Sequence, residues 1–276
     1  MNRNNLTLPG IAAPVLVLVG LVLASTNAAG QTENALVSFS TGIEYSGGTY
    51  GGTYDLEELY VPLTMRADFS RFGVRLTVPY LRVDFPVEVD PDGQPVPESA
   101  STVTQSGLGD IIGSATVYDV FVSGDADFVV DLTGKIKFAT ADEQKGLGTG
   151  ENDYNFQVEA YRFFDRFTLQ GLAGYRLRGD PPGVDLSNVF LASVGSSFRA
   201  SQSASLGLYY DYRQAALSGF DDIQEVSGYA SFRLNENWRL QFYAFTGFGN
   251  NSPEFGGGIL VTTDLRQPRL TERDSY

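Results

Sequence analysis

Apolar and polar residues alternate through most of the chain, starting near residue 36. Between residues 128 and 138, for example, Leu132 and Ile136 alternate with Asp131 and Lys135. A period of two residues is that of a β-strand with one apolar and one polar face. The pattern indicates a chain built of strands, each of which separates two different environments.

The alternation recurs about every twenty residues and predicts about twelve strands, each near the roughly ten residues that cross a bilayer at a tilt. The predicted strands are residues 36–45, 57–69, 72–84, 109–121, 127–138, 153–163, 167–178, 189–198, 205–213, 224–234, 238–248 and 255–265. The connections alternate between short turns and longer polar links, and the longest link, residues 85–106, is where we expect any inward-folded gate. Outer-membrane barrels have short periplasmic turns and longer extracellular loops, so this order places both termini in the periplasm.

Sorting the charges by face gives each strand a neutral side and a charged side. Mid-strand positions expected to point outward, such as Leu206, Leu208 and Tyr210, carry no charge. A lysine or arginine there would cost about 2–4 kcal/mol at the bilayer midplane. A soluble sandwich shows the same alternation, so the faces alone do not separate it from a membrane barrel.

Aromatic residues favour the membrane. Phe69 and Trp238 stand beside short turns, whereas Tyr80 and Phe248 stand beside long loops. Two such girdles at the two interfaces are typical of a lipid-embedded barrel. We therefore predict an all-β fold, a transmembrane antiparallel up-and-down β-barrel of about twelve strands. An exported soluble β-sandwich or a lipocalin-like barrel is the alternative.

The first thirty residues read as a secretory signal peptide. Arg3 precedes an apolar run, residues 11–24, which is too short to span a bilayer as a helix, and small residues follow at 26–30. An uncleaved membrane anchor is the alternative. The predicted division is signal peptide 1–30, outer-membrane barrel 31–265 and polar C-terminal tail 266–276. Cleavage would deliver the mature protein to the bacterial outer membrane.

The composition narrows the function classes. The 276 residues contain no cysteine and no histidine. Without imidazole the chain cannot build a Ser-His nucleophile system, and it lacks a common zinc ligand and general base. We therefore expect no enzymatic activity, no metal and no cofactor. The net charge of −14 at pH 7 also argues against nucleic acid as a partner, because phosphates would be repelled.

The inward charges and tyrosines are the candidates for a solute path. Twelve strands enclose a backbone cylinder about 24 Å wide, which side chains narrow to about 10 Å or less. These charges either form cross-lumen ion pairs that satisfy one another or form a basic ladder that guides an anionic aromatic acid past the tyrosines. The candidates are Lys135, Lys137, Arg66, Arg75, Arg176, Arg213, Arg239, Asp131, Tyr60 and Tyr161.

Short glycine-rich motifs resemble those of a known family. Gly-Leu-Gly-Asp at residues 107–110 opens the predicted fourth strand, and a strand end with Lys137, Thr140 and Asp142 leads to Gly-Leu-Gly-Thr-Gly at residues 146–150. Their order resembles the outer-membrane family named for the meta-cleavage pathway of phenol degradation. The matched positions of the glycine motifs are Gly107, Gly109, Asp110, Gly146, Gly148 and Gly150.

The resemblance implies a barrel channel or transporter for aromatic or other hydrophobic small molecules. One departure concerns the strand end: Ala139 and Ala141 stand where the family usually has proline and glycine, which puts the shape of that loop in question. The expected function is a passive outer-membrane channel for such molecules. The alternative is a closed structural or adhesive barrel with acidic loops. The expected partners are outer-membrane lipid and lipopolysaccharide, the barrel-assembly machinery and a small-molecule solute.

Overall fold

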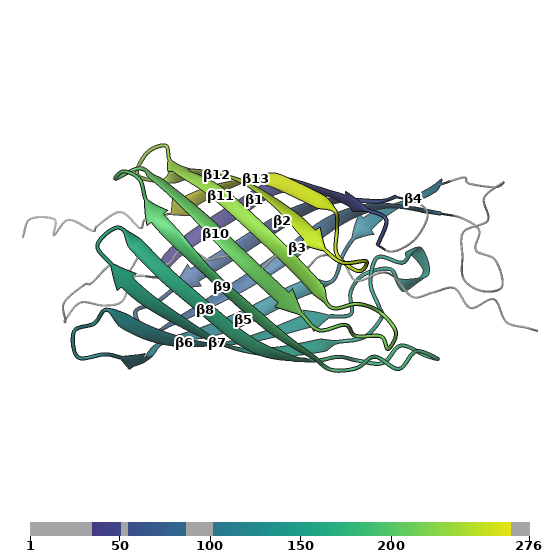
Figure 1. Ribbon diagram of the computed structural model, residues 1–276. Helices are drawn as coiled ribbons and strands as arrows, with labels where there is room; N and C mark the ends of the chain where they lie inside the picture. The colour runs from purple at the N-terminus through teal and green to yellow at the C-terminus, as the bar shows by residue number, and fades with distance from the viewer. Residues whose placement is uncertain (1–34, 51–54, 87–101, 266–276) are drawn as a thin grey trace, which may run out of the picture.

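The computed structural model describes residues 35–50, 55–86 and 102–265. The expected signal peptide and polar tail lie outside the described residues. The described strands (Figure 1) are β1 (Leu36–Gly48), β2 (Leu56–Asp68), β3 (Phe72–Pro86), β4 (Thr102–Leu108), β5 (Ile111–Val122), β6 (Phe128–Phe138), β7 (Asp153–Phe164), β8 (Phe167–Leu177), β9 (Val189–Arg199), β10 (Ala204–Arg213), β11 (Ile223–Arg233), β12 (Trp238–Phe248) and β13 (Phe255–Leu265). A 3-10 helix spans Glu143–Lys145. Within the described ranges, no helix is long and apolar enough to cross a membrane.

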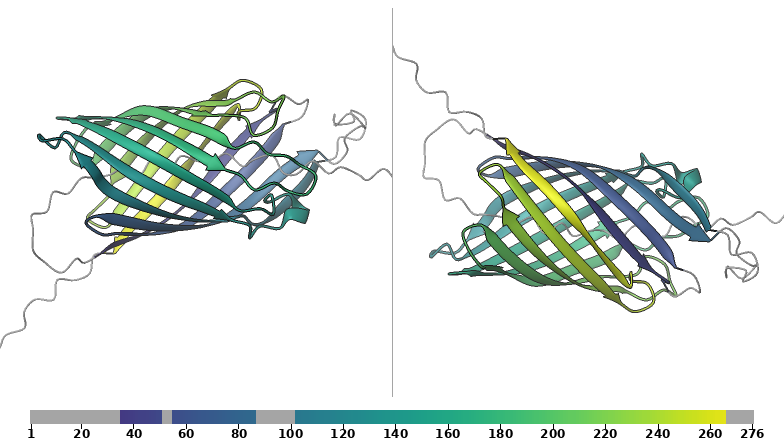
Figure 2. Two further views of the ribbon diagram at one scale, coloured as in Figure 1. Left: turned by 90° about the horizontal axis from the view of Figure 1, so that it is seen from below. Right: turned by 90° about the horizontal axis from the view of Figure 1, so that it is seen from above.

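Twelve strands close into a barrel whose strands are steeply inclined (Figure 2). Every pairing in the sheet is antiparallel, and β1 completes the ring by pairing with both β2 and β13. The first part of β3 pairs with β5 and the later part with β4, so β4 is an extra strand outside the ring. The predicted up-and-down barrel of about twelve strands is confirmed.

One stretch was predicted wrongly. Residues 85–106 were expected to be a single long loop, but β3 continues to Pro86 and β4 begins at Thr102. The β-branched residues Thr102, Val103 and Thr104 favour a strand. They follow residues 94–101, a stretch rich in proline and serine, and this loop-like composition led to the prediction of a loop for the whole link. The expected gate in this link falls largely on residues 87–101, which lie outside the described residues.

The start of β5, which is the fourth strand of the ring, also differs from the prediction. The Gly-Leu-Gly-Asp motif was expected to open this strand, but its first two residues end β4. Gly109 and Asp110 separate the two strands. The Gly109 N–H donates to the carbonyl oxygen of Pro79 at 2.9 Å, and a Cβ at Gly109 would lie 2.7 Å from Leu81 Cδ1. A side chain at residue 109 would therefore have to displace the Leu81 side chain of β3.

The outside of the barrel is apolar and the inside is polar. Val194 and Leu208 are each 61% exposed in mid-strand, whereas Glu44 is 2% and Asp131 is 3% exposed. A soluble protein rarely exposes so continuous an apolar surface. Inverted burial of this kind is what lipid outside and a wet lumen inside require.

Aromatic pairs mark both ends of this apolar surface. Phe69 and Phe72 stack at 4.4 Å, and Phe167 and Phe198 approach to 4.7 Å, beside short turns. At the end with the long loops, the ring centroids of Tyr45 in β1 and Phe255 in β13 lie 6.1 Å apart. These positions agree with the two girdles predicted from the sequence.

Candidate functional site in the barrel lumen

The strand register arranges the inward charges in rows. Arg66 of β2 lies directly opposite Arg75 of β3, and Lys135 of β6 shares their row with Arg176 of β8. We call these four cations the basic row. The complete row from β1 to β9 is Ser38, Arg66, Arg75, Ser114, Lys135, Asn155, Arg176 and Val189.

The basic row crosses most of the barrel height. Arg66 lies near the end of β2 that leads into a short turn, whereas Arg176 lies near the end of β8 that leads into a long loop. A row runs perpendicular to its strands, and barrel strands tilt by about 35–45° from the axis. The cations therefore climb the lumen wall as they pass from strand to strand.

A second row carries the opposite charge. Asp131, Glu159, Asp211 and Glu225 share one register row from β6 to β11, which we call the acidic row. On β6 it is four residues from the basic row, a separation of about 13 Å along a strand. The two charges are thus sorted into parallel stripes, with a row between them that contains Gln157, Leu191 and Arg213.

Aromatic residues occupy the next two rows beyond the acidic row. Tyr161, Tyr209 and Phe245 lie in one of them, and Tyr229, Tyr243 and Tyr60 lie in the other. The rings of Tyr209 and Tyr229 stack at 6.1 Å. Tyr243 donates a hydrogen bond of 2.5 Å to Glu44, which holds this buried carboxylate. The lumen therefore offers an aromatic stripe as well as charged ones.

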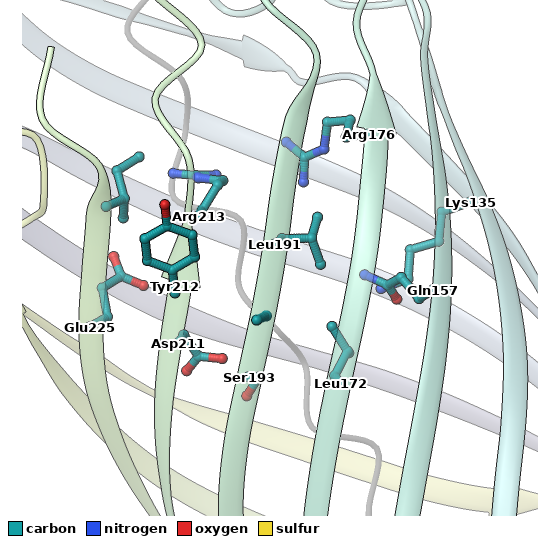
Figure 3. Close-up of a pocket in the computed structure, with 12 residues that line it drawn as sticks. Lys135, Gln157, Leu172, Arg176, Leu191, Ser193, Asp211, Tyr212, Arg213 and Glu225 are labelled. Atoms are coloured by element: carbon teal, nitrogen blue, oxygen red, sulfur yellow. The ribbon is translucent and has the colours of Figure 1, made fainter.

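A hollow lies between the basic and acidic rows (Figure 3), with about 480 Å³ of space when the open solvent at its mouth is included. Lys135 and Arg176 line its basic side, Asp211 and Glu225 line its acidic side, and Arg213 lies in the row between them. Leu172, Leu191 and Ile223 provide an apolar wall.

The three cations of this hollow have no ion pair among the described residues. No carboxylate oxygen there lies within 4.0 Å of a nitrogen of Lys135, Arg176 or Arg213. Arg176 is only 9% exposed. Gln157 is 5% exposed, and its side-chain oxygen has no hydrogen-bond partner in the described part of the chain. The hollow thus presents polar groups that an incoming solute could satisfy.

Two other candidate cations, Arg66 and Arg239, are paired. Arg66 binds Asp68 with an N–O distance of 2.6 Å and donates to the hydroxyl of Tyr118, which in turn donates to Asp68. Arg239 lies 3.9 Å from Asp264. Ion pairs within one strand or between neighbouring strands therefore explain part of the inward charge and leave the hollow unexplained.

The glycine motifs of residues 107–110 and 146–150 meet between β4 and β5. Asp110 forms an ion pair of 3.1 Å with Lys137, and its other oxygen accepts from the backbone N–H groups of Thr140 and Ala141, each at 3.0 Å. Lys137 also lies 3.4 Å from Asp153. We call this group the Asp110 node. It ties the strand break to the loop of residues 139–152.

The loop glycines leave room for the Asp110 node. A Cβ at Gly148 would lie 2.9 Å from Asp110 Oδ2, and Gly150 adopts a φ of +73° that favours glycine. The departure at Ala139 also has a physical consequence. Its backbone N–H donates to the side-chain oxygen of Asn152 at 2.8 Å, a bond that proline could not make. The motif residues thus have structural roles at the long-loop end.

A second tie holds the long loop between β10 and β11. The Tyr212 hydroxyl donates to Asp222 at 2.6 Å, and the Ala215 N–H donates to the other oxygen of Asp222 at 2.8 Å. These two hydrogen bonds keep the pKa of the Asp222 carboxyl below its usual range.

Sequence reasoning placed all ten path candidates on the lumen face, but missed how they are grouped. Lys135 and Arg176 share the hollow, whereas Lys137 belongs to the Asp110 node. The hollow also contains Gln157, Leu172 and Leu191, which were not candidates. Apolar residues on a predicted inward face, such as the two leucines, are the signal that could have revealed them.

Comparison with known proteins agrees with the fold. No protein-family model matches the sequence, and no curated protein matches it. Among solved structures, a COG4313 outer membrane channel from Pseudomonas putida F1 superposes with a TM-score of 0.69 and 12% identity, covering 87% of this chain and 100% of that chain. A KdgM porin superposes with a TM-score of 0.53 and 8% identity, covering 83% and 99%. Both likenesses establish the fold, that of an outer-membrane β-barrel.

Proposed function

We propose that this protein is a passive outer-membrane channel that lets small molecules pass through the barrel lumen. The observation that carries the proposal is the polar hollow in the lumen wall, with three cations that lack an ion pair among the described residues. A barrel whose charges served only structure would pair them, because unpaired buried charge is costly. A wet, chemically sorted lumen is instead suited to solute passage.

The solutes of this channel are small aromatic or hydrophobic molecules. Two features support this class: the stacked rings of Tyr209 and Tyr229 inside the lumen, and the apolar wall of the hollow at Leu172 and Leu191. The resemblance of the motifs to the phenol-degradation family points the same way. An apolar solute can exchange contacts with such groups along the lumen without strong binding at any one of them.

The test is ion conductance of the refolded mature protein in a planar lipid bilayer. We expect discrete current steps, because a lumen with a polar lining fills with water and conducts ions. The narrow lumen should give smaller steps than a sixteen-stranded porin measured in the same salt. A barrel that inserts and resists protease but never conducts would refute the channel and favour the closed structural or adhesive barrel.

A further inference from the structure

We propose that the hollow between the basic and acidic rows is a binding site for an organic carboxylate with an apolar body. The carboxylate would lie against Lys135, Arg176 and Arg213, and the apolar body against Leu172 and Leu191. This inference deepens the proposed channel function by giving its solute a charge. It rests on that function only for how the solute reaches the site.

The charge of the ligand follows from the groups without partners. Three cations line the hollow, and no ion pair satisfies any of them within the described part of the chain. A guanidinium group binds a carboxylate through two parallel hydrogen bonds. Arg176 and Arg213 each provide one such group at the hollow. An anion would replace water around these part-buried cations and offset the cost of burying their charge.

The orientation of the ligand follows from the rows. Asp211 and Glu225 repel an anion at one side of the hollow, while Lys135 and Arg176 attract it at the other (Figure 3). Gln157 lies in the row between them. The ligand therefore binds with its charged end at the basic row.

The apolar wall sets the remaining chemistry of the ligand. Leu172 and Leu191 are each 7% exposed although they face the lumen of a barrel that is otherwise polar inside. Ile223 extends the same wall. Neighbouring groups already cover most of these leucines, and the small part that lines the hollow is what an apolar ligand would contact. A single-ring or short-chain carboxylate would cover this part.

The first experiment measures binding in detergent solution, where no transport is needed. The probe is 4-fluorobenzoate, followed by fluorine NMR on the refolded protein, with 4-fluorobenzyl alcohol as its uncharged counterpart. We expect the acid to bind and the alcohol to bind at least tenfold more weakly. Equal affinities for the two probes would overturn the site.

The variants identify the residues. Arg176→Gln should weaken 4-fluorobenzoate about tenfold, the loss of one charged hydrogen-bonding partner. Arg176→Lys should recover part of the affinity because it keeps the charge without the bidentate geometry. Arg199→Gln, at an exposed short-turn position, is the matched control and should bind like the wild type. If Arg176→Gln fails to fold, Lys135→Gln serves in its place. Unchanged affinity in a folded variant of either residue would refute the proposal.

The same protein in a bilayer separates this site from the channel. Conductance without probe tests the channel, and its reduction by 4-fluorobenzoate tests the site. Charge-dependent binding in detergent without any conductance would leave the site standing and remove the channel. Conductance combined with no preference for the acid would do the reverse.

Discussion

At the scale of single residues, the lumen wall is packed by rings set over glycines of the next strand. A Cβ at Gly207 would lie 2.1 Å from Tyr229, and one at Gly195 would lie 2.0 Å from Tyr209. Phe245 covers Gly256 in the same way. An aromatic ring over a strand glycine shields exposed backbone and fixes the ring's rotamer. These pairs hold the aromatic rows in place.

The pairing of Tyr229 with Gly207 predicts a stability loss. Gly207→Ala should lower the free energy of unfolding by about 1–3 kcal/mol, because the new methyl group overlaps the Tyr229 ring. Urea unfolding in lipid vesicles, followed by protease resistance, measures the effect. Gly171→Ala is the control, since a Cβ there meets nothing within 4 Å. Equal losses in both variants would show that the ring contact is irrelevant.

At the scale of elements, the break between β4 and β5 concentrates the polar contacts of the long-loop end. Asp110 binds one side chain and two backbone N–H groups of a segment about thirty residues later in the chain. Asp110 therefore helps to hold the loop of residues 139–152, together with the hydrogen bond from the Ile111 N–H to Thr140 Oγ1 at 2.9 Å, and Leu147 of this loop is 5% exposed. Loss of this carboxylate should loosen the loop without opening the ring.

The Asp110 node makes a proteolysis prediction. Asp110→Asn should speed tryptic cleavage after Lys145 about tenfold, because a charged hydrogen-bonding partner of the loop is lost. Mass spectrometry of timed digests identifies the cut. Asp165→Asn, in a short turn at the other end, should leave the rate unchanged. Wild-type cleavage in a folded Asp110→Asn barrel would contradict the role given to this carboxylate.

The sequence predicts faces far better than it predicts partners across strands. A period of two identifies the inward side of β12 and β13, whose bounds match the prediction at both ends. It does not fix register. The pairing of β5 with β6 shifts between Val117 and Phe121, where Asp119 has a φ of 54°. Such an irregularity leaves the alternation intact on either side, so the rows of charge could not be predicted from pattern alone.

At the scale of the whole molecule, the barrel reverses the usual arrangement of a folded domain. Val194, on the outside of β9, is 61% exposed, whereas its neighbour Ser193 lines the polar hollow. Adjacent residues of one strand thus meet lipid and water. Placing the same charged residue at each of these two positions therefore measures how much the lipid-facing side contributes to the free energy of unfolding.

A pair of variants measures this difference. Val194→Arg should destabilise the barrel in lipid vesicles by about 2–4 kcal/mol, because it places a charge in the apolar layer. Ser193→Arg introduces the same side chain into the wet lumen beside Asp211 and should cost much less. Urea titration of both variants in phosphatidylcholine vesicles gives the two values. Equal costs would argue that both faces meet water, as in a soluble barrel.

The climb of the basic row has a consequence for motion. Its four cations extend over β2, β3, β5, β6, β7 and β8, which together form half of the twelve-stranded ring. A solute that stays in contact with these cations crosses five of the twelve inter-strand steps, and so turns through less than half a circle about the barrel axis while it advances. The cations therefore follow a helical line along the lumen wall, and the tilt of the strands sets the rise of this line per turn.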